Sequence, residues 1–380
     1  MLFQRSMSSI ALGLALTVAA LSTGCHSGGD FGSTKSLEQR RAEFPIVAED
    51  WRKIGYQLDW TGFPEVTGNL PVQFIKAYPD LVVTLEGGSH LTFLEATTGN
   101  RRASNQLANP LTKFVALGRD GDRILAISEA EVFTVDHQTG ILRSRQKTEK
   151  NVATEPVQSG NTLIFGTPSG EVLAHLAVGS VGGVKAWGFA TGSAIMHKPV
   201  LIGPFVGTVS QAGAVYFLDA QTGGLAGSNS IYAGLDTDPV SDGQAMYVAS
   251  VDQSIYAFAP QGGAVLWRHR TSTPLRSQPA VHGGKLFVSV PGQGLVAFDC
   301  ANGNIVWTCK NFANGVVVAV NRANLVVFNG EEAALIDAQR GDVIDRAKLP
   351  GIAILQPDTF VDGNLYAVSK SGVVAKFLRR

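Results

Sequence analysis

The sequence has no excess of charge of either sign and little cysteine. Its 380 residues include 31 basic and 31 acidic side chains, so the formal net charge is zero. Proteins that bind nucleic acids or anionic membranes over a broad surface need a positive potential, so a general nucleic-acid partner is excluded. Only three cysteines are present, at Cys25, Cys300 and Cys309.

Motifs of catalytic and metal centres are also missing. The seven histidines form neither HExxH nor a Cys–His zinc spacing, and neither GxSxG nor GxxxxGK[ST] occurs. Carboxylates recur once per repeat at turns, where aspartate accepts backbone N–H bonds; they are Asp136, Asp219, Asp299 and Asp337. We therefore expect no enzyme and no catalytic, metal-binding or cofactor-binding residues.

Glycine, by contrast, is abundant, with 43 residues, and short apolar runs recur along the chain. Such runs are apolar at consecutive positions, which is typical of strands covered on both faces by neighbouring sheets. A repeat of about 40 residues is the length of a propeller blade. Eight runs begin 39 to 43 residues apart, at Leu81, Ile124, Leu163, Val206, Met246, Leu286, Leu325 and Leu365.

Each repeat carries further elements in the same order. A second strand follows the apolar run, and a turn ending in glycine follows that strand, as at 220–224 and 300–304. Trp187, Trp267 and Trp307 lie four residues after such a glycine, where an indole would pack blade against blade. The pattern predicts an all-β, eight-bladed β-propeller of four-stranded antiparallel blades. Prolines open many of the units, at Pro71, Pro110, Pro156, Pro199, Pro239, Pro279 and Pro357.

The last repeat ends without the turn and the tryptophan-bearing strand. Residues 55–62, with Trp60 at the tryptophan position, have the pattern of the missing strand. We predict that this N-terminal strand completes the last blade and leaves no open sheet edge there. The propeller would then span 45–380, with one short helix over 45–54 that packs Trp51 on the domain.

The N-terminus has the features of an export signal. One basic residue, Arg5, precedes an apolar stretch over 10–21 that is shorter than the ~20 residues of a membrane span, and small residues follow. Cys25 stands where bacterial lipoproteins carry their lipidated cysteine. We predict a lipoprotein signal peptide over 1–24 and a flexible, lipid-anchored tether over 25–44. Ordinary signal cleavage beside an incidental cysteine is the alternative.

Cys300 and Cys309 lie on either side of a proposed turn at 302–303. In that hairpin their positions are offset by about four residues, or about 13 Å at ~3.3 Å per residue. A disulfide requires Cα atoms within about 7 Å. We therefore expect two buried free thiols, with a disulfide as the alternative in an oxidising compartment.

The repeat resembles the pyrroloquinoline-quinone-type propeller repeat, most clearly over 253–270 and 294–310. The resemblance covers roughly 55–380. With its lipoprotein signal and eight units, the chain is most similar to the BamB family, lipoproteins of the machinery that inserts β-barrel proteins into the outer membrane. The resemblance implies a non-catalytic, periplasm-facing outer-membrane lipoprotein whose partner is a BamA-type barrel protein.

Members of that family bind their partner through loops between blades in the middle of the ring. One acidic residue of that surface precedes a Thr-Pro-Val-like blade opening, and residues 236–240 have that layout. The resemblance therefore assigns Asp236 to the surface, and Asp238 lies in the same acidic patch. The family's Leu-Arg segment before the preceding blade is absent, and His197 and Lys198 stand near that place as candidates.

A second candidate patch is basic. It contains Arg268, His269, Arg270 and Arg276, around residues 271–274. For both patches, a solvated loop between blades is the alternative.

Three functions remain open at this point. The first is a scaffold lipoprotein of outer-membrane assembly, with a protein partner and a monomeric propeller. The second is another periplasmic binding propeller of the same repeat family. The third is a quinoprotein-type oxidoreductase, but those enzymes are much longer, hold calcium beside the quinone and carry a pair of adjacent cysteines, which this sequence lacks.

Overall fold

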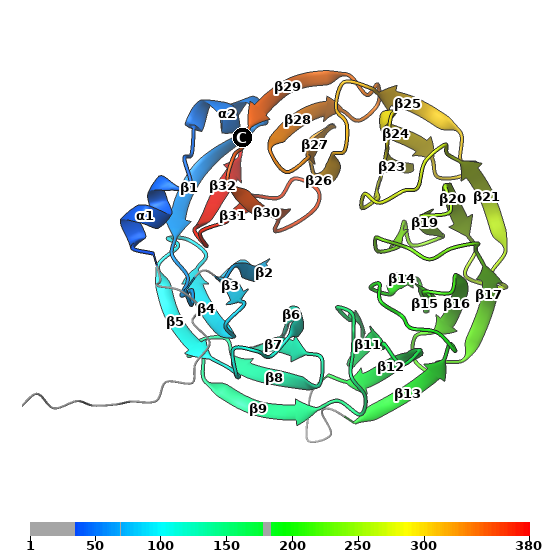
Figure 1. Cartoon of the computed structure of the whole chain (residues 1–380), viewed down its shortest axis with the longest axis horizontal. Helices are drawn as coiled ribbons and strands as arrows, with labels where there is room; N and C mark the ends of the chain where they lie inside the picture. The colour runs from blue at the N-terminus through cyan, green and yellow to red at the C-terminus, as the bar shows by residue number, and fades with distance from the viewer. Residues whose placement is uncertain (1–34, 69, 178–183) are drawn as a thin grey trace, which may run out of the picture. The chain divides into compact units, whose positions relative to one another are not determined.

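Eight four-stranded antiparallel sheets stand around a central channel, as the sequence predicts (Figure 1). The computed structural model describes residues 35–68, 70–177 and 184–380. We number the sheets as blades 1 to 8 in chain order. Each blade runs from an inner strand at the channel to an outer strand at the rim. The eight-bladed all-β propeller is confirmed.

Blades 1 to 7 each consist of four consecutive strands. Blade 1 contains β2 (Val72–Ala77), β3 (Leu81–Glu86), β4 (His90–Glu95) and β5 (Arg101–Gln106). Blade 2 contains β6 (Phe114–Asp120), β7 (Arg123–Ser128), β8 (Glu131–Asp136) and β9 (Leu142–Lys147). Blade 3 contains β10 (Val157–Ser159), β11 (Thr162–Gly166), β12 (Glu171–Leu176) and β13 (Lys185–Ala190). Blade 4 contains β14 (Val200–Ile202), β15 (Phe205–Val209), β16 (Ala214–Asp219) and β17 (Leu225–Ser230).

The second half of the ring repeats this order. Blade 5 contains β18 (Val240–Ser241), β19 (Met246–Ser250), β20 (Ser254–Phe258) and β21 (Val265–Arg270). Blade 6 contains β22 (Ala280–His282), β23 (Lys285–Val290), β24 (Gly294–Asp299) and β25 (Ile305–Cys309). Blade 7 contains β26 (Val316–Asn321), β27 (Asn324–Phe328), β28 (Glu332–Asp337) and β29 (Val343–Lys348). Blade 8 contains β30 (Ile352–Pro357), β31 (Leu365–Ser369), β32 (Val374–Arg379) and β1 (Tyr56–Gly62).

The second strand of each blade is one of the eight apolar runs. Every residue of β3, β19 and β31 is buried. Both faces of these strands are covered because each blade packs between two others, so the side chains fill the space between sheets. The core is therefore a series of clusters between blades rather than one central core. Of the prolines expected to open units, Pro357 is the exception, since it is the last residue of an inner strand.

Each tryptophan of the repeat joins its blade to the next one. The Trp267 indole Nε1–H donates to the Cys300 carbonyl at 2.8 Å, and the ring lies against the turn glycine Gly303 of blade 6. A Cβ built on that glycine would come within 2.5 Å of the indole, so only glycine leaves room for the ring. The packing role predicted for the tryptophans is confirmed. The same arrangement joins Trp60 to Gly99, Trp187 to Gly223 and Trp307 to Gly341.

The strand β1 closes the ring as predicted. It pairs antiparallel with β32, from Tyr56 opposite Arg379 to Gly62 opposite Val374. Trp60 is 7% exposed and donates its indole N–H to the Ala96 carbonyl of blade 1 at 3.0 Å. The two ends of the propeller are therefore joined within one sheet.

Among the described residues, two short helices precede β1. Helix α2 (Ala48–Lys53) lies within the predicted helical segment, and its Trp51 stacks on Phe377 with ring centroids 3.4 Å apart. Helix α1 (Leu37–Ala42) lies in the segment expected to be a flexible tether. The structure places this part differently, because the buried Arg40 donates to three backbone carbonyls of the propeller.

Cys300 and Cys309 are free and buried, as expected. Cys309 lies opposite Leu295 in the register of blade 6, so the two cysteines are not cross-strand neighbours. Burial raises the pKa of the Cys300 thiol, which keeps it protonated and unreactive.

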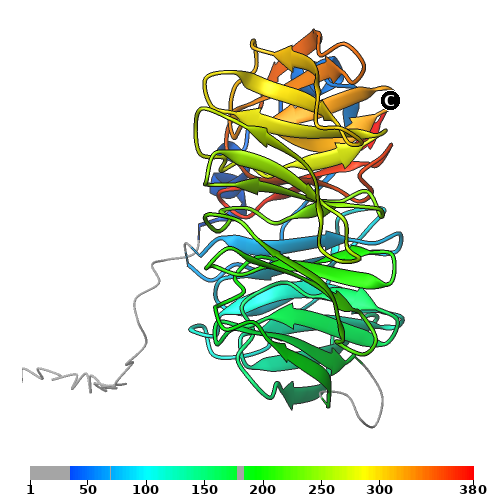
Figure 2. The same cartoon turned by 90° about the vertical axis from the view of Figure 1, so that its right-hand side faces the viewer.

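The ring has two faces, and the strands run from one to the other (Figure 2). We call linker face the side with the loops that join the outer strand of one blade to the inner strand of the next. The opposite side, with the glycine turns before the outer strands, is the turn face. There, an aspartate accepts two backbone N–H bonds in each of four turns, which confirms the turn role of Asp136, Asp219, Asp299 and Asp337.

Candidate protein-binding site

Three loops of the linker face share one design. They span 191–199, 231–239 and 271–279, and each ends in a proline that opens the next blade. One aliphatic side chain anchors each loop in the core, and the following residue points out of it. The anchors are Ile195, Leu235 and Leu275, and the residues after them are Met196, Asp236 and Arg276.

Asp236 and Arg276 form an ion pair between neighbouring loops. Their side chains are 38% and 67% exposed. An exposed pair contributes only about 0–1 kcal/mol to stability, so both side chains remain available to a partner. The sequence predicts a basic patch of Arg268, Arg270 and Arg276, whereas in the structure Arg276 pairs with Asp236.

Asp238 connects three loops instead of standing free. Its carboxylate accepts the Lys198 backbone N–H at 2.8 Å, and its own N–H donates to the Gln278 side-chain oxygen at 3.0 Å. The Gln278 amide donates back to the Asp238 carbonyl at 3.1 Å. All three residues directly precede a proline, which favours extended backbone at that position. Asp238 therefore fixes the spacing of the loops.

His197 adds a second bond between the same loops. Its Nε2 lies 2.6 Å from the Leu235 carbonyl, and its Nδ1 lies 3.7 Å from the Asp238 carboxylate. A protonated imidazole donates from both nitrogens, whereas a neutral one donates from one. The nearby Asp238 carboxylate is the largest cause that raises the pKa of His197, and burial opposes it.

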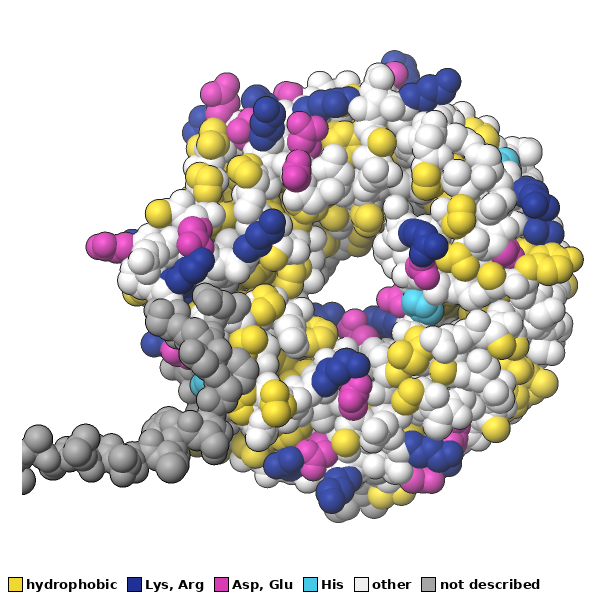
Figure 3. Space-filling model, in the orientation of Figure 1, with side chains coloured by type: hydrophobic (Ala, Val, Ile, Leu, Met, Phe, Trp, Pro, Cys, Tyr) yellow, Lys and Arg dark blue, Asp and Glu magenta, His cyan; other side chains and the backbone are white. Residues whose placement is uncertain are grey.

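Lys198 extends the contacts into the channel. Its ammonium lies 3.4 Å from the Glu155 carboxylate, which also pairs with Lys76 of β2 at 2.9 Å. On the face shown in Figure 3, a histidine and side chains of both signs lie around the channel mouth. The described inner strands of blades 3 to 8 line a cavity of about 570 Å³ in the channel, whose wall includes Val200, Val240, Val281, Val318 and Phe360.

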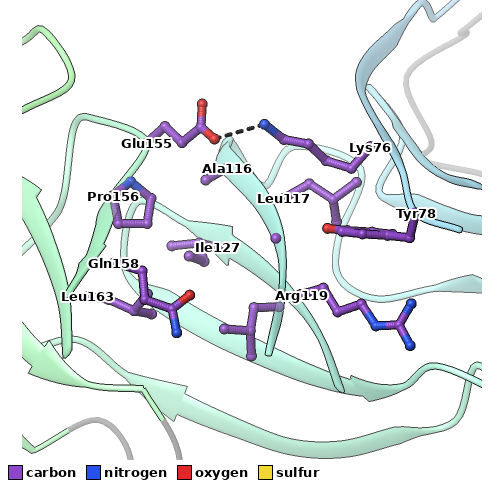
Figure 4. Close-up of a pocket in the computed structure, with 12 residues that line it drawn as sticks. Lys76, Tyr78, Ala116, Leu117, Arg119, Ile127, Glu155, Pro156, Gln158 and Leu163 are labelled. Atoms are coloured by element: carbon purple, nitrogen blue, oxygen red, sulfur yellow. Dashed lines mark hydrogen bonds and ion pairs between the residues drawn. The ribbon is translucent and has the colours of Figure 1, made fainter. Parts of the chain in front are cut away.

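A smaller cavity of about 200 Å³ lies beside the Lys76–Glu155 pair, between blades 2 and 3 (Figure 4). Leu117, Ile127 and Leu163 are among its apolar lining residues, and Tyr78 stands at its side. Burial raises the pKa of Tyr78 to about 12, so the phenol is neutral at physiological pH. Each charged residue that lines this cavity is in an ion pair, Lys76 with Glu155 and Arg119 with Asp80.

Arg268 and Arg270 lie on the outer strand β21. The Arg268 guanidinium lies over the rings of Tyr232 and Tyr256, at 5.5 and 5.1 Å, and donates to Ser254 Oγ at 2.9 Å. Arg270 is exposed at the end of the strand. Tyr232, which the sequence did not single out, is 86% exposed and extends this surface outwards.

Gln278 and Glu155 also take part in these contacts between loops, and the sequence patterns did not identify them. Both directly precede a proline that opens a blade, as Lys198 and Asp238 do. Comparison of the pre-proline positions of successive repeats would have identified them, because equivalent positions of neighbouring blades lie side by side at the channel.

Other predicted features lie outside this surface. Cys25 and the predicted signal peptide lie outside the described residues. Neither helix among the described residues has the length and hydropathy needed to cross a membrane. Within the same residues, no group of three or more His, Cys, Asp or Glu side chains could hold a metal ion.

Comparison with known proteins gives one family and two informative structures. The family described as outer membrane protein assembly factor BamB matches residues 57–226 and 211–380. The crystal structure of BamB from Moraxella catarrhalis is similar with a TM-score of 0.67 at 17% identity, over 85% of this chain and 99% of that chain. The computationally designed protein Ika8 gives a TM-score of 0.70 at 12% identity, over 85% and 100%. At these identities the likeness shows the fold alone, and no curated protein matches the sequence.

Proposed function

The chain belongs to the BamB family of outer membrane protein assembly factors, and we propose that it is a non-catalytic scaffold that binds a protein of that assembly machinery. The linker-face site formed by Met196, Asp236 and Arg276 would be the binding surface. A BamA-type barrel assembly protein is the partner that the family suggests.

The observation that carries this proposal is the contrast between exposed tips and a fixed base. Asp236 and Arg276 contact each other only through an exposed ion pair at the loop tips. The Asp238 side chain is also partly exposed, but its carboxylate accepts the Lys198 backbone N–H and its backbone is bonded to Gln278, so the base of the loops is held together. Such a surface loses little conformational freedom on binding, which favours affinity. Charged groups of both signs at the tips suit a partner with a complementary polar surface.

We propose further that residues 1–24 are a lipoprotein signal peptide and that Cys25 is lipidated. The protein would then face the periplasm from the outer membrane. Incorporation of radioactive palmitate into the native protein, and its loss in Cys25→Ser, would support this. Unchanged incorporation in that variant would refute it.

Co-purification tests the partner. The tagged full-length protein is extracted in mild detergent, and the proteins recovered with it are identified. Recovery of a large β-barrel assembly protein supports the proposal, and reproducible recovery of a different envelope protein assigns another partner.

Charge reversal then tests the surface. We expect Asp236→Lys to reduce recovery at least about tenfold, because like charges across an interface cost several kcal/mol. Asp342→Lys is the matched control, since Asp342 is an exposed aspartate in a turn of blade 7 on the turn face. Equal recovery with both variants would remove Asp236 from the interface. The melting temperatures of both variants should stay near that of the native protein.

A further inference from the structure

A basic pocket lies between α1 and the loop that joins β31 to β32. The cavity has a volume of about 240 Å³, and three basic side chains line it, Lys35, Arg40 and Lys370. Among its described lining residues there is no acidic side chain. Its size is below the roughly 300–1,000 Å³ of pockets for drug-sized ligands, so it suits a small charged group.

Arg40 is the unusual member of this cluster. The residue is only 4% exposed, and its guanidinium donates to the carbonyls of Ser371, Gly372 and Pro64 at 2.9, 2.7 and 3.1 Å. These carbonyls satisfy N–H donors but carry no net charge. Among the described residues, no carboxylate lies within 4 Å of this guanidinium. The carboxylate that acts on Arg40 from beyond this distance is Glu65, which is itself paired with Arg101. A buried cation that lacks a direct ion pair is costly, so an anion in the adjacent cavity would be favoured.

The two lysines can move toward such an anion. Lys370 is exposed at the rim of the pocket. Lys35 pairs with Glu43 at 2.7 Å, but both side chains are about half exposed, so the pair is weak and its ammonium can shift to a second acceptor. Glu43 balances the charge of Lys35, and Glu65 is shared between Arg40 and Arg101. Within the described residues, Lys370 has no ion pair, so the pocket keeps a net positive charge.

The basic character continues along α1. Arg41 lies over the Phe63 ring at 4.7 Å, and Arg101 pairs with Glu65 beside a second cavity of about 560 Å³. The two cavities share Lys35, Arg40 and Val66 in their walls.

We propose that this pocket is a phosphate subsite in which Arg40, Lys370 and Lys35 hold one phosphate group. Guanidinium and ammonium groups are the side chains that proteins use for phosphate, and charge-assisted bonds are the strong ones. The phosphate belongs either to an anionic phospholipid headgroup or to a free phosphate ion. Lys35 is the tenth residue after Cys25, so its Cα atom lies at most about 35 Å from that of Cys25. The headgroup assignment therefore rests on the proposed lipid anchor, whereas the subsite itself does not.

The test measures binding to the full-length protein in a neutral detergent. The melting temperature is recorded against increasing sodium phosphate, with sodium chloride at matched ionic strength as the reference. A ligand that binds the folded state raises the melting temperature. A second series uses dihexanoyl phosphatidylglycerol, with the same concentration of neutral detergent as its reference. Lys370→Gln and Lys35→Gln change exposed side chains only. Lys310→Gln, at an exposed lysine after blade 6, is the matched control.

We expect phosphate to raise the melting temperature and Lys370→Gln to weaken the fitted affinity about tenfold, because the variant loses one charge-assisted hydrogen bond to the phosphate. Lys310→Gln should bind as the native protein does. Tighter binding of the phosphatidylglycerol than of inorganic phosphate assigns the site to a headgroup, and the reverse assigns it to free phosphate. No stabilisation by either ligand, or equal affinity in Lys370→Gln and the native protein, overturns the subsite. Partner recovery is a separate measurement, so failure here leaves the scaffold proposal intact.

Discussion

Ring closure depends on the contact between Trp60 and Gly99, and a pair of glycine substitutions isolates it. Gly99 has φ +72°, and a Cβ on it would come 2.4 Å from the Trp60 indole. Gly121 also has a positive φ, +57°, but a Cβ there would meet nothing within 4 Å. Both alanine variants therefore adopt a left-handed backbone, and only Gly99→Ala also displaces the tryptophan.

The expected costs follow from these two differences. A left-handed alanine lowers the free energy of unfolding by about 1–2 kcal/mol, and Gly121→Ala should have this effect alone. Overpacking adds about 1–3 kcal/mol, so Gly99→Ala should lose about 2–5 kcal/mol. At about 2 °C per kcal/mol for a large domain, the melting temperature should fall about 2–6 °C further in Gly99→Ala than in Gly121→Ala.

Thermal unfolding followed by circular dichroism measures the difference, and a double substitution tests its cause. Trp60→Ala alone should cost about 3–5 kcal/mol, because a large buried side chain is lost. Once the indole is absent, adding Gly99→Ala should cost only the left-handed strain, so the two effects are not additive. Equal losses for Gly99→Ala and Gly121→Ala, or full additivity with Trp60→Ala, would refute the closure contact.

Three further outcomes are expected. The raised pKa of His197 means that its contribution to stability is fully present below its ordinary pKa of 6.5 and is lost as the pH rises through the higher folded value. In denaturant unfolding, the difference in free energy of unfolding between the native protein and His197→Gln should shrink from pH 6 to pH 9, and a growing difference would contradict the electrostatic contact with Asp238. Cys300 and Cys309 should react with a thiol reagent only after unfolding in urea, and fast labelling of the folded protein would disprove their burial. Deletion of residues 55–62 should leave the protein aggregated or unfolded, because β32 loses its partner strand; a soluble variant that melts cooperatively would refute closure by that strand.

The fold could be predicted from the sequence because the ring imposes the same requirement on each blade. The second strand must be apolar at consecutive positions, and the turn before the outer strand needs a glycine that the neighbouring tryptophan can cover. Those requirements recur about every 40 residues, so they appear as a counted repeat. The last repeat lacks its fourth strand, and Trp60 has the tryptophan position of that strand but lies before the first repeat. Together these two features identified the closing strand.

The role of α1 could not be predicted in the same way. Arg40 stands in a charged segment near the N-terminus, and such a segment usually lies in solvent. Its burial depends on carbonyls of Ser371 and Gly372, more than 330 residues away in the chain. No local pattern records that contact, and because it occurs in only one blade, no repeat reveals it either.

At the candidate site, neighbouring positions of one repeat differ in how firmly they are bonded, which is why we propose a structural role for one and a binding role for the other. Asp236 and Asp238 are two residues apart, and sequence alone treats them as one acidic patch. The pre-proline position of Asp238 lies beside its equivalents in the adjacent blades, so its polar groups are bonded within the ring. The position of Asp236 follows the buried anchor Leu235 and has no such neighbour contact beyond an exposed ion pair. The pre-proline position of the repeat therefore holds the loops together. The position after the anchor can vary between blades, where it is Met196, Asp236 or Arg276. Specificity for a partner can change at these tips without loss of the fold, which is how one propeller scaffold accommodates different binding surfaces.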